Sequence, residues 1–388
     1  MRYESARLAG FSAVADKESR RSFDTSFFVL VILLLTMGVV MVLSSSYARA
    51  YYDPGNITGG NAVYYFVRQL LYAVLGVAAM LFASRLPMNL YKRFAFHFLA
   101  AVLVLLLLVP FIGVKANGAR RWLGVGGLTV QPSELAKLAV IISFSALICR
   151  FRGRMRSFRY GILPFAAILC VIIGLLVLEP HFSASVIIIA IGGAMLFLGG
   201  VRLGWFAAAF GTAGAAVAVL LTFFPYASSR INTWRDPFSS SSDEGYQIVQ
   251  SLYSIGSGGL SGLGLGGSRQ KFLYLPEEHN DFIFSVVCEE MGFIGAALIL
   301  VLFAMLILRG YWIALHTPDR FGFLVCAGVT TLLAIQVFLN VAVVTNLVPC
   351  TGISLPFFSY GGTALLMQLG EMGIILSISR DIPTKKAR

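Results

Sequence analysis

The sequence predicts an all-α polytopic membrane protein of about ten transmembrane helices, with a large extracytoplasmic loop between helices 7 and 8. Hydrophobic residues make up 58% of the 388 residues and charged residues only 12%, which is more apolar than a water-soluble protein of this size needs. The hydrophobic residues gather in runs near the roughly 20 residues that a spanning helix requires. Lysine and arginine also recur in alternate loops between these runs. Together these observations exclude a soluble globular domain.

The predicted spans follow one another along the whole chain. In order they are Ser26–Leu43, Tyr64–Ala83, Phe94–Val109, Leu135–Cys149, Gly161–Leu178, Ser183–Leu198, Leu203–Phe224, Phe282–Leu308, Phe321–Val344 and Leu355–Ser379. Residues 1–25 are then a cytoplasmic N-terminal tail, residues 26–380 the membrane domain and residues 381–388 a cytoplasmic C-terminal tail. No convincing small-residue cleavage site accompanies the first run, which predicts a retained anchor.

Positive charge predicts the orientation. It collects in the leader, at Arg85, Lys92 and Arg93, at Arg150 to Arg159, at Arg202, at Arg309 and Arg320, and after Ser379. With ten spans all these segments lie on one side, which the positive-inside rule makes cytoplasmic, together with both termini. The net charge of +12 belongs to these short loops, so nucleic acid is not an expected partner.

The longest predicted outer loop is 225–281. The serine run Ser239–Ser242 favours a turn, and apolar spacing within Asp243–Ser257 predicts an amphipathic helix near the membrane surface. Gly256–Phe282 is rich in glycine, but no strand precedes it and no Gly-Lys-Ser follows. A tight re-entrant turn is therefore favoured over a nucleotide-binding loop.

Ionisable residues near span ends indicate where chemistry can occur, because an uncompensated charge is costly in hydrocarbon. Asp281 ends the long loop and opens the eighth span, just after Glu277, Glu278 and His279. As a helix cap it would accept backbone N–H bonds. A half-sheltered carboxylate there could equally bind a cation or take a proton, and both interpretations stay open.

A second cluster occupies Asn117–Lys137. Arg120 and Arg121 lie on an outward loop, where topology disfavours cations, and guanidinium groups grip phosphate oxygens well. They predict an anionic ligand, with contact to lipid headgroups as the alternative. Glu134 and Lys137 share a helix face at i,i+3 spacing and could simply pair with each other. Arg68, near the outer end of the second span, could join either role.

A third cluster, Asn340–Ala364, has prolines and glycines interrupting apolar sequence. Such a segment must bend at membrane depth, where its freed backbone groups need protein or water partners. Glu371, deeper in the last span, could form a hydrogen bond between helices or a proton-sensitive site.

These clusters resemble the SEDS family of bacterial shape, elongation, division and sporulation proteins, which includes FtsW, RodA and SpoVE. The resemblance rests on ARRW with QPSELAK, on LPEEHNDFIF with EEMGFIG, and on PCTGISLPFFSYGG. It is closest to the FtsW and SpoVE branch, because Asn280 stands where the rod-elongation loop usually reads His-Thr-Asp. His181 in EPHFSAS departs from rod-type relatives, which commonly carry an acidic residue there.

The resemblance implies a protein of the bacterial cytoplasmic (inner) membrane. It implies a peptidoglycan glycosyltransferase that polymerises lipid II at the outer face of that membrane during cell division or spore cortex synthesis. It implies a class B penicillin-binding protein as partner, beside other division or sporulation membrane proteins. The family's catalytic acidic residue falls on Asp281. Its cavity residues fall on Arg120, Arg121, Trp122, Glu134 and Lys137.

We therefore expect Asp281 to deprotonate the acceptor sugar hydroxyl or to hold a divalent cation, Mg²⁺ or Mn²⁺. Arg120, Arg121 and Lys137 would steady the donor pyrophosphate, and attack would invert the anomeric carbon. Arg68 and His279 complete the predicted substrate-binding set, and no organic cofactor is expected.

Two other functions remain open for the same sequence. One is a lipid II flippase without chemistry, although a transporter should have polar residues near the midplane and matched halves. The other is a non-catalytic division scaffold. The long loop favours a scaffold, but the many ionisable residues in that loop do not.

Overall fold

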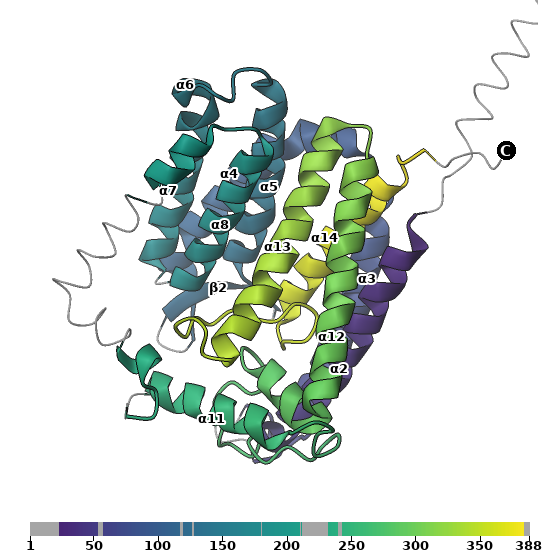
Figure 1. Ribbon diagram of the computed structural model, residues 1–388, viewed down its shortest axis with the longest axis vertical. Coiled ribbons are helices and arrows are strands. Elements are labelled where there is room, and N and C mark those ends of the chain that lie inside the picture. Colours follow the sequence, from purple (N-terminus) through teal and green to yellow (C-terminus); the bar gives the residue numbers. More distant parts are fainter. Residues whose placement is uncertain are drawn as a thin grey trace, which may run out of the picture.

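Long apolar helices account for most of the structure, a computed structural model that describes residues 23–52, 57–116, 119–125, 128–179, 181–209, 211, 232–239 and 243–383. Within these residues, eight helical stretches are long and apolar enough to cross a membrane. They comprise α2 (Thr25–Tyr52), α3 (Tyr64–Ala83), α4 (Met88–Ile112), α5 (Pro132–Arg150), α6 (Phe158–Gly161) with α7 (Leu163–Leu178), α12 (Ile283–His316), α13 (Arg320–Val344) and α14 (Gly362–Ser379). The helices run side by side as a bundle (Figure 1).

Two further predicted spans are not among these eight helical stretches. The sixth corresponds to the shorter apolar helix α8 (Phe182–Leu198). Of the seventh, Leu203–Phe224, only 203–209 and 211 are described, and these residues are helical. The rest of that prediction lies outside the described residues. The chain is a multi-pass α-helical membrane protein.

The predicted ends of four spans are wrong. Helix α4 begins at Met88 rather than Phe94, and α12 continues past Leu308 to His316. Helix α2 continues past Leu43 to Tyr52, because hydroxyl groups satisfy the polar positions: Ser46 Oγ donates to Val42 O at 2.6 Å. Helix α14 begins at Gly362 rather than Leu355. Pro356 lacks an N–H group, and Phe357 has a φ of 65°, so this segment cannot be helical.

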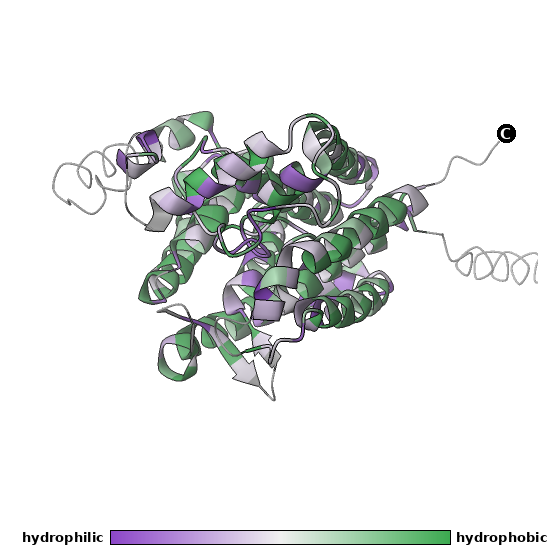
Figure 2. Ribbon diagram, turned by 90° about the horizontal axis from the view of Figure 1, so that it is seen from below, coloured by the Kyte–Doolittle hydropathy of each residue, from purple (hydrophilic) through white to green (hydrophobic). Residues whose placement is uncertain are grey.

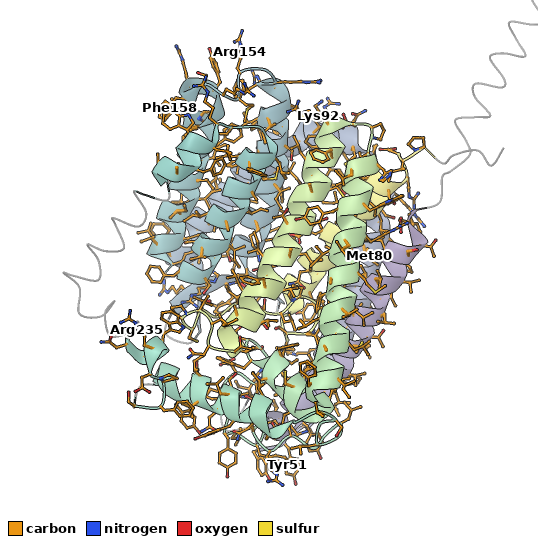
Figure 3. All side chains as sticks on the ribbon, in the orientation of Figure 1. Tyr51, Met80, Lys92, Arg154, Phe158 and Arg235 are labelled. Carbon is orange, nitrogen blue, oxygen red and sulfur yellow. The ribbon has the colours of Figure 1, made fainter. Side chains whose placement is uncertain are left out.

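The two ends of the described chain meet at one end of the bundle. Asp24 N donates to Ser379 Oγ at 3.0 Å, and Arg309 pairs with the Asp24 carboxylate at 2.7 Å. Lys92 and Arg154 lie toward this end, whereas Tyr51 and Arg235 lie at the other (Figure 3). The lysine- and arginine-rich loops and the residues beside both termini therefore share a side, as the charge pattern predicts.

The opposite end carries a small sheet that the sequence analysis did not predict. Strands β1 (Val114–Ala116), β2 (Ala119–Val125) and β3 (Leu128–Val130) form an antiparallel sheet in that order between α4 and α5. Leu123 pairs with Val130, which brings β2 beside the start of α5. The outward arginines are thus held on a strand rather than on an irregular loop.

The long segment between the predicted seventh and eighth spans is described in part. Helix α11 (Asp243–Ser257) confirms the predicted amphipathic helix. Seen from this end of the bundle, hydrophilic residues are most frequent in α11 and the neighbouring loops, while most transmembrane segments are coloured as hydrophobic (Figure 2).

The glycine-rich segment after α11 packs against α12 at a point where that helix is interrupted. Gly292 has a φ of 66°, so the α-helical hydrogen bonds are interrupted there. Leu263 N donates to Glu289 O at 2.9 Å, and Phe293 N donates to Gly259 O at 2.9 Å. A Cβ on Gly262 would lie 2.2 Å from Glu290 O, so the close approach requires glycine. The glycines serve chain packing rather than phosphate binding.

Candidate functional site

A cavity of about 420 Å³ lies at the end of the bundle that carries the sheet. Its walls come from α3, β2, the β3–α5 junction, the first turns of α5, α8 and α14, the middle of α13, and two non-helical segments that precede α12 and α14. The polar and charged side chains that line it are Arg68, Tyr72, Trp122, Thr129, Gln131, Glu134, Lys137, His181, Glu277, Asn280, Asp281, Gln336, Ser354, Ser359, Tyr360, Thr363 and Gln368. The three clusters found in the sequence therefore meet at one place.

Asp281 sits in a tight turn rather than on a helix. Asn280 N and Phe282 N both donate to Glu277 O, at 3.0 and 3.3 Å, and Glu277 adopts a φ of 56°. The helix-cap interpretation is wrong, because α12 begins after Phe282 and no side chain caps it. The carboxylate of Asp281 is directed into the cavity instead, where it remains partly exposed.

The bent segment before α14 holds this turn in place. Asn340 Nδ2 donates to Asp281 O at 2.8 Å and to Ile353 O at 2.7 Å. Ser359 Oγ donates to Asn280 O at 2.8 Å, and Tyr360 N donates to His279 O at 2.9 Å. The backbone groups freed by the bend thus find protein partners, as predicted, and these partners fix the conformation around Asp281.

Gly352 provides space for the carboxylate. A Cβ built on this glycine would lie 2.8 Å from Asp281 Oδ2, which is closer than Cβ atoms approach in real structures. The backbone conformation at Gly352 does not itself require glycine, since its φ lies outside the left-handed region. The constraint is therefore steric and acts on Asp281.

The surroundings of Asp281 favour its protonated form. The pKa of its carboxyl is raised from 3.8 to about 7: burial has the largest effect, the negative charge of Glu277 adds to it, and Arg121 opposes both. A carboxyl group with a pKa near neutrality is suited to take and release a proton at physiological pH.

Cationic side chains share the cavity with Asp281. Lys137 on α5 is buried and its Nζ lies 2.6 Å from Glu134 Oε2, so the predicted i,i+3 pair is present. Arg68 on α3 is exposed and its guanidinium lies 4.4 Å from the centroid of the Tyr64 ring. Two cations beside one carboxyl of raised pKa can bind an anionic ligand and exchange a proton next to it.

The remaining predicted residues differ in whether they line the cavity. Trp122 lines the cavity. Arg121 lies close enough to influence the pKa of Asp281 without lining it. Arg120 Nη1 instead donates to Pro110 O and Phe111 O, at 3.0 and 3.2 Å, at the end of α4.

His279 also lies outside the cavity lining, packed between aromatic rings. Its ring centroid is 4.7 Å from that of Tyr65 and 5.8 Å from that of Tyr360. Burial lowers the pKa of His279 to about 3, with a smaller contribution from Arg49, so the imidazole is neutral at physiological pH. His279 therefore contributes to the packing around the turn that carries Asp281.

Several lining residues were not selected from the sequence. Gln336 and Gln368 are buried amides on α13 and α14, and a polar side chain inside an apolar span is a signal that could have identified them. Glu277 could have been identified by its place four residues before Asp281. His181 was noticed only as a departure from related sequences.

No group of three or more histidine, cysteine, aspartate or glutamate side chains suited to a metal ion occurs among the described residues. Asp281 and Glu277 line the same cavity and interact electrostatically. Mg²⁺ is commonly held by one or two carboxylates together with substrate phosphates, so this pair fits a divalent cation that arrives with a phosphorylated substrate.

The sequence of this chain is similar to those of known proteins. A family model described as a cell cycle protein, covering FtsW, RodA and SpoVE, matches residues 24–383. Stage V sporulation protein E of Bacillus subtilis is 38% identical over 365 residues, which are 93% of this chain and 98% of that protein. A protein of Trichlorobacter lovleyi named probable peptidoglycan glycosyltransferase FtsW is 38% identical over 362 residues, 93% of this chain and 94% of its own.

Solved structures share the fold. A chain from work on structural coordination of polymerization and crosslinking by a peptidoglycan synthase complex superposes with a TM-score of 0.76 at 28% identity, covering 94% of this chain and 99% of that one. The rod shape determining protein RodA of Thermus thermophilus superposes with a TM-score of 0.67 at 27% identity, covering 94% and 98%.

Proposed function

The chain belongs to the FtsW, RodA and SpoVE family of cell cycle proteins, and from that premise we propose that it is a peptidoglycan glycosyltransferase that polymerises lipid II. The observation that carries the proposal is one cavity in which Asp281, with a pKa of about 7, faces the same space as Lys137 and Arg68. Polymerisation of a lipid-linked disaccharide needs both a base and cations.

The reaction assigns a role to each of these groups. The Asp281 carboxylate takes the proton from the acceptor sugar hydroxyl, whose oxygen forms a bond to the anomeric carbon of the donor. The bond from that carbon to the pyrophosphate oxygen breaks, and the leaving polyprenyl pyrophosphate keeps the electron pair. Lys137 and Arg68 stabilise the negative charge that develops on it. Displacement at a single carbon inverts its configuration.

A divalent cation would bind in the same cavity, next to the reacting groups. Asp281 and Glu277 would hold Mg²⁺ or Mn²⁺, and the cation would neutralise pyrophosphate charge. Asn280 Nδ2 donates to Glu277 Oε2 at 2.5 Å, which orients that carboxylate. In this arrangement Asp281 would be a metal ligand as well as a base.

The orientation follows from the distribution of charge. The positive-inside rule places the end with Lys92 and Arg154 in the cytoplasm, so the sheet and the cavity face the outer side of the cytoplasmic membrane. Both termini are then cytoplasmic. Lipid II reaches such a site from the outer leaflet, during division or spore cortex synthesis.

A partner supplies cross-linking. The structural relative belongs to a complex that coordinates polymerization and crosslinking. We propose that this chain likewise works with a class B penicillin-binding protein and assembles with other membrane proteins of division or sporulation.

Purified protein with fluorescent lipid II and a penicillin-binding partner that lacks its own glycosyltransferase activity tests the proposal. Glycan ladders on a gel are the expected result. Translocation of lipid II in vesicles without ladders would replace the proposal with a flippase, and neither activity would leave a scaffold.

The pH dependence of polymerisation should reflect Asp281. Because the base must be deprotonated and burial raises its pKa to about 7, kcat/KM should rise through pH 7 and level off above pH 8. Initial rates of glycan formation between pH 5.5 and 9 measure this profile. Glu277→Gln removes a neighbouring negative charge and should move the rise to lower pH. A flat profile from pH 5.5 upward would show that Asp281 does not titrate in the reaction.

Substitution of Gly352, which lines the same cavity, should disturb the reaction by displacing the Asp281 carboxylate. In Gly352→Ala the new Cβ displaces the Asp281 carboxylate, and a displacement of about 1 Å can lower a rate about 100-fold. Gly370→Ala is the matched control, since nothing lies near a Cβ at that position. Equal polymerisation by Gly352→Ala and the unmodified chain would contradict the proposed position of the base.

A further inference from the structure

The turn between α7 and α8 carries two titratable side chains that the proposed reaction does not use, Glu179 and His181. Glu179 N and His181 N both donate to Leu176 O, at 3.2 and 3.1 Å. His181 O in turn accepts from Ser185 N and Ser185 Oγ, both at 3.3 Å. These hydrogen bonds hold the backbone at residues 179 and 181.

Both side chains are buried with polar atoms that lack a hydrogen-bond partner among the described residues. Glu179 is 1% exposed and neither carboxyl oxygen has a partner, while His181 is 9% exposed and its Nδ1 has none. An unsatisfied buried polar group costs free energy, so such groups are rare unless a ligand satisfies them. His181 lines the same cavity as Asp281, which gives a ligand access to it.

The charges around this pair favour an anion. Arg121 on β2 interacts electrostatically with both residues, and Lys137 on α5 interacts with His181. Burial raises the pKa of Glu179 to about 8, and burial together with these cations lowers that of His181 to about 3. At neutral pH the Glu179 carboxyl is therefore protonated and the imidazole is neutral. Arg121 and Lys137 then supply positive charge beside His181, while Glu134, the one acidic residue of α5, is paired with Lys137, and Asp281 also interacts with Arg121.

We propose that His181, flanked by Arg121 and Lys137, is a subsite for the pyrophosphate group that the lipid donor carries and the leaving lipid retains. His181 is the contacting residue, and it takes one proton from solvent when the anion binds. Glu179 lies on the same turn and in its protonated form places no negative charge beside the anion. The identity of the ligand rests on the proposed function, whereas the anion site rests on the geometry of the cavity.

Calorimetric titration of the purified full chain with farnesyl pyrophosphate tests the proton uptake directly. Titrations at pH 7 in two buffers of different ionisation enthalpy give the number of protons bound with the ligand. We expect the unmodified chain to take up about one proton more than His181→Gln, and His181→Gln to raise Kd about tenfold or more. His97→Gln, an exposed histidine on α4, is the matched control and should behave as the unmodified chain does.

Glu179→Gln supplies a second, isosteric test. As pH rises through 8 the unmodified Glu179 loses its proton, so farnesyl pyrophosphate should bind more weakly at pH 9 than at pH 7. The Glu179→Gln variant carries no charge at either pH and should lose less affinity over that range. Elution volume and thermal unfolding identify any variant that fails to fold, and Glu179→Gln remains informative if His181→Gln does.

Equal affinity and equal proton uptake by the unmodified chain and folded His181→Gln would overturn the subsite. So would an identical pH dependence of the unmodified chain and Glu179→Gln. Glycan synthesis is measured in parallel: ladders without these binding differences reject the subsite alone, whereas binding differences without ladders reject the proposed function alone.

Discussion

Asp281→Asn should reduce glycan polymerisation by about 10²- to 10⁴-fold, because loss of a positioned general base typically has that effect. Asparagine preserves the size of the side chain and leaves the Asn340 contact to the backbone of residue 281 intact. The protein should therefore still insert and fold. Initial rates of glycan formation from lipid II, normalised to protein in the membrane, measure the loss.

Asp319→Asn is the matched control for this substitution. Asp319 caps α13 at the opposite end of the bundle by accepting from Gly322 N at 3.0 Å, and asparagine is an equally good cap. The control should polymerise glycan at the unmodified rate. Polymerisation by Asp281→Asn within a factor of two of that rate would remove Asp281 from the mechanism.

Lys271→Met should lower the free energy of unfolding by about 3–5 kcal/mol, the usual cost of leaving a buried charge without its partner. Lys271 Nζ lies 2.8 Å from Glu290 Oε1, and the two side chains are 3% and 0% exposed. The same ammonium donates to Ser44 Oγ at 3.2 Å, so it joins the loop before Asp281 to α2 and α12. Denaturant unfolding of the purified protein in detergent measures the change.

Lys92→Met tests whether the loss comes from burial. Lys92 is an exposed lysine at the other end of the bundle, and its removal should change the free energy of unfolding by less than about 0.5 kcal/mol. A similarly small change for Lys271→Met would mean that the buried pair does not stabilise the outer segment.

The membrane-spanning helices could be predicted from the sequence because lipid imposes a simple requirement on each of them separately. A run of about 20 apolar residues satisfies its own backbone hydrogen bonds as a helix, whatever its neighbours are. The same local reasoning predicted helix Asp243–Ser257 from its apolar spacing and the Glu134–Lys137 pair from the i,i+3 rule. Asp281 was found in the same way, as a carboxyl group at the end of a span.

The composition of the cavity could not be predicted in that way, because it depends on which helices pack together. Gln336 and Gln368 face the same cavity as His181, although about 150 residues or more separate them from it in the chain. Arg120 and Arg121 are neighbours in sequence, yet one contacts carbonyl groups at the end of α4 and the other influences Asp281. Both lie on strand β2, which directs successive side chains to opposite faces and was not predicted.

The sequence by itself therefore determined the membrane class, the approximate positions of the spans and the acidic residue at the centre of the site. These properties follow from hydrophobic runs and from the cost of placing charge in lipid. Only the tertiary structure decided the pKa of Asp281, the room that Gly352 leaves for its carboxylate, and the exposure of His181 to the same cavity. Each of these depends on burial and on contacts between segments far apart in the chain, which a linear pattern does not record.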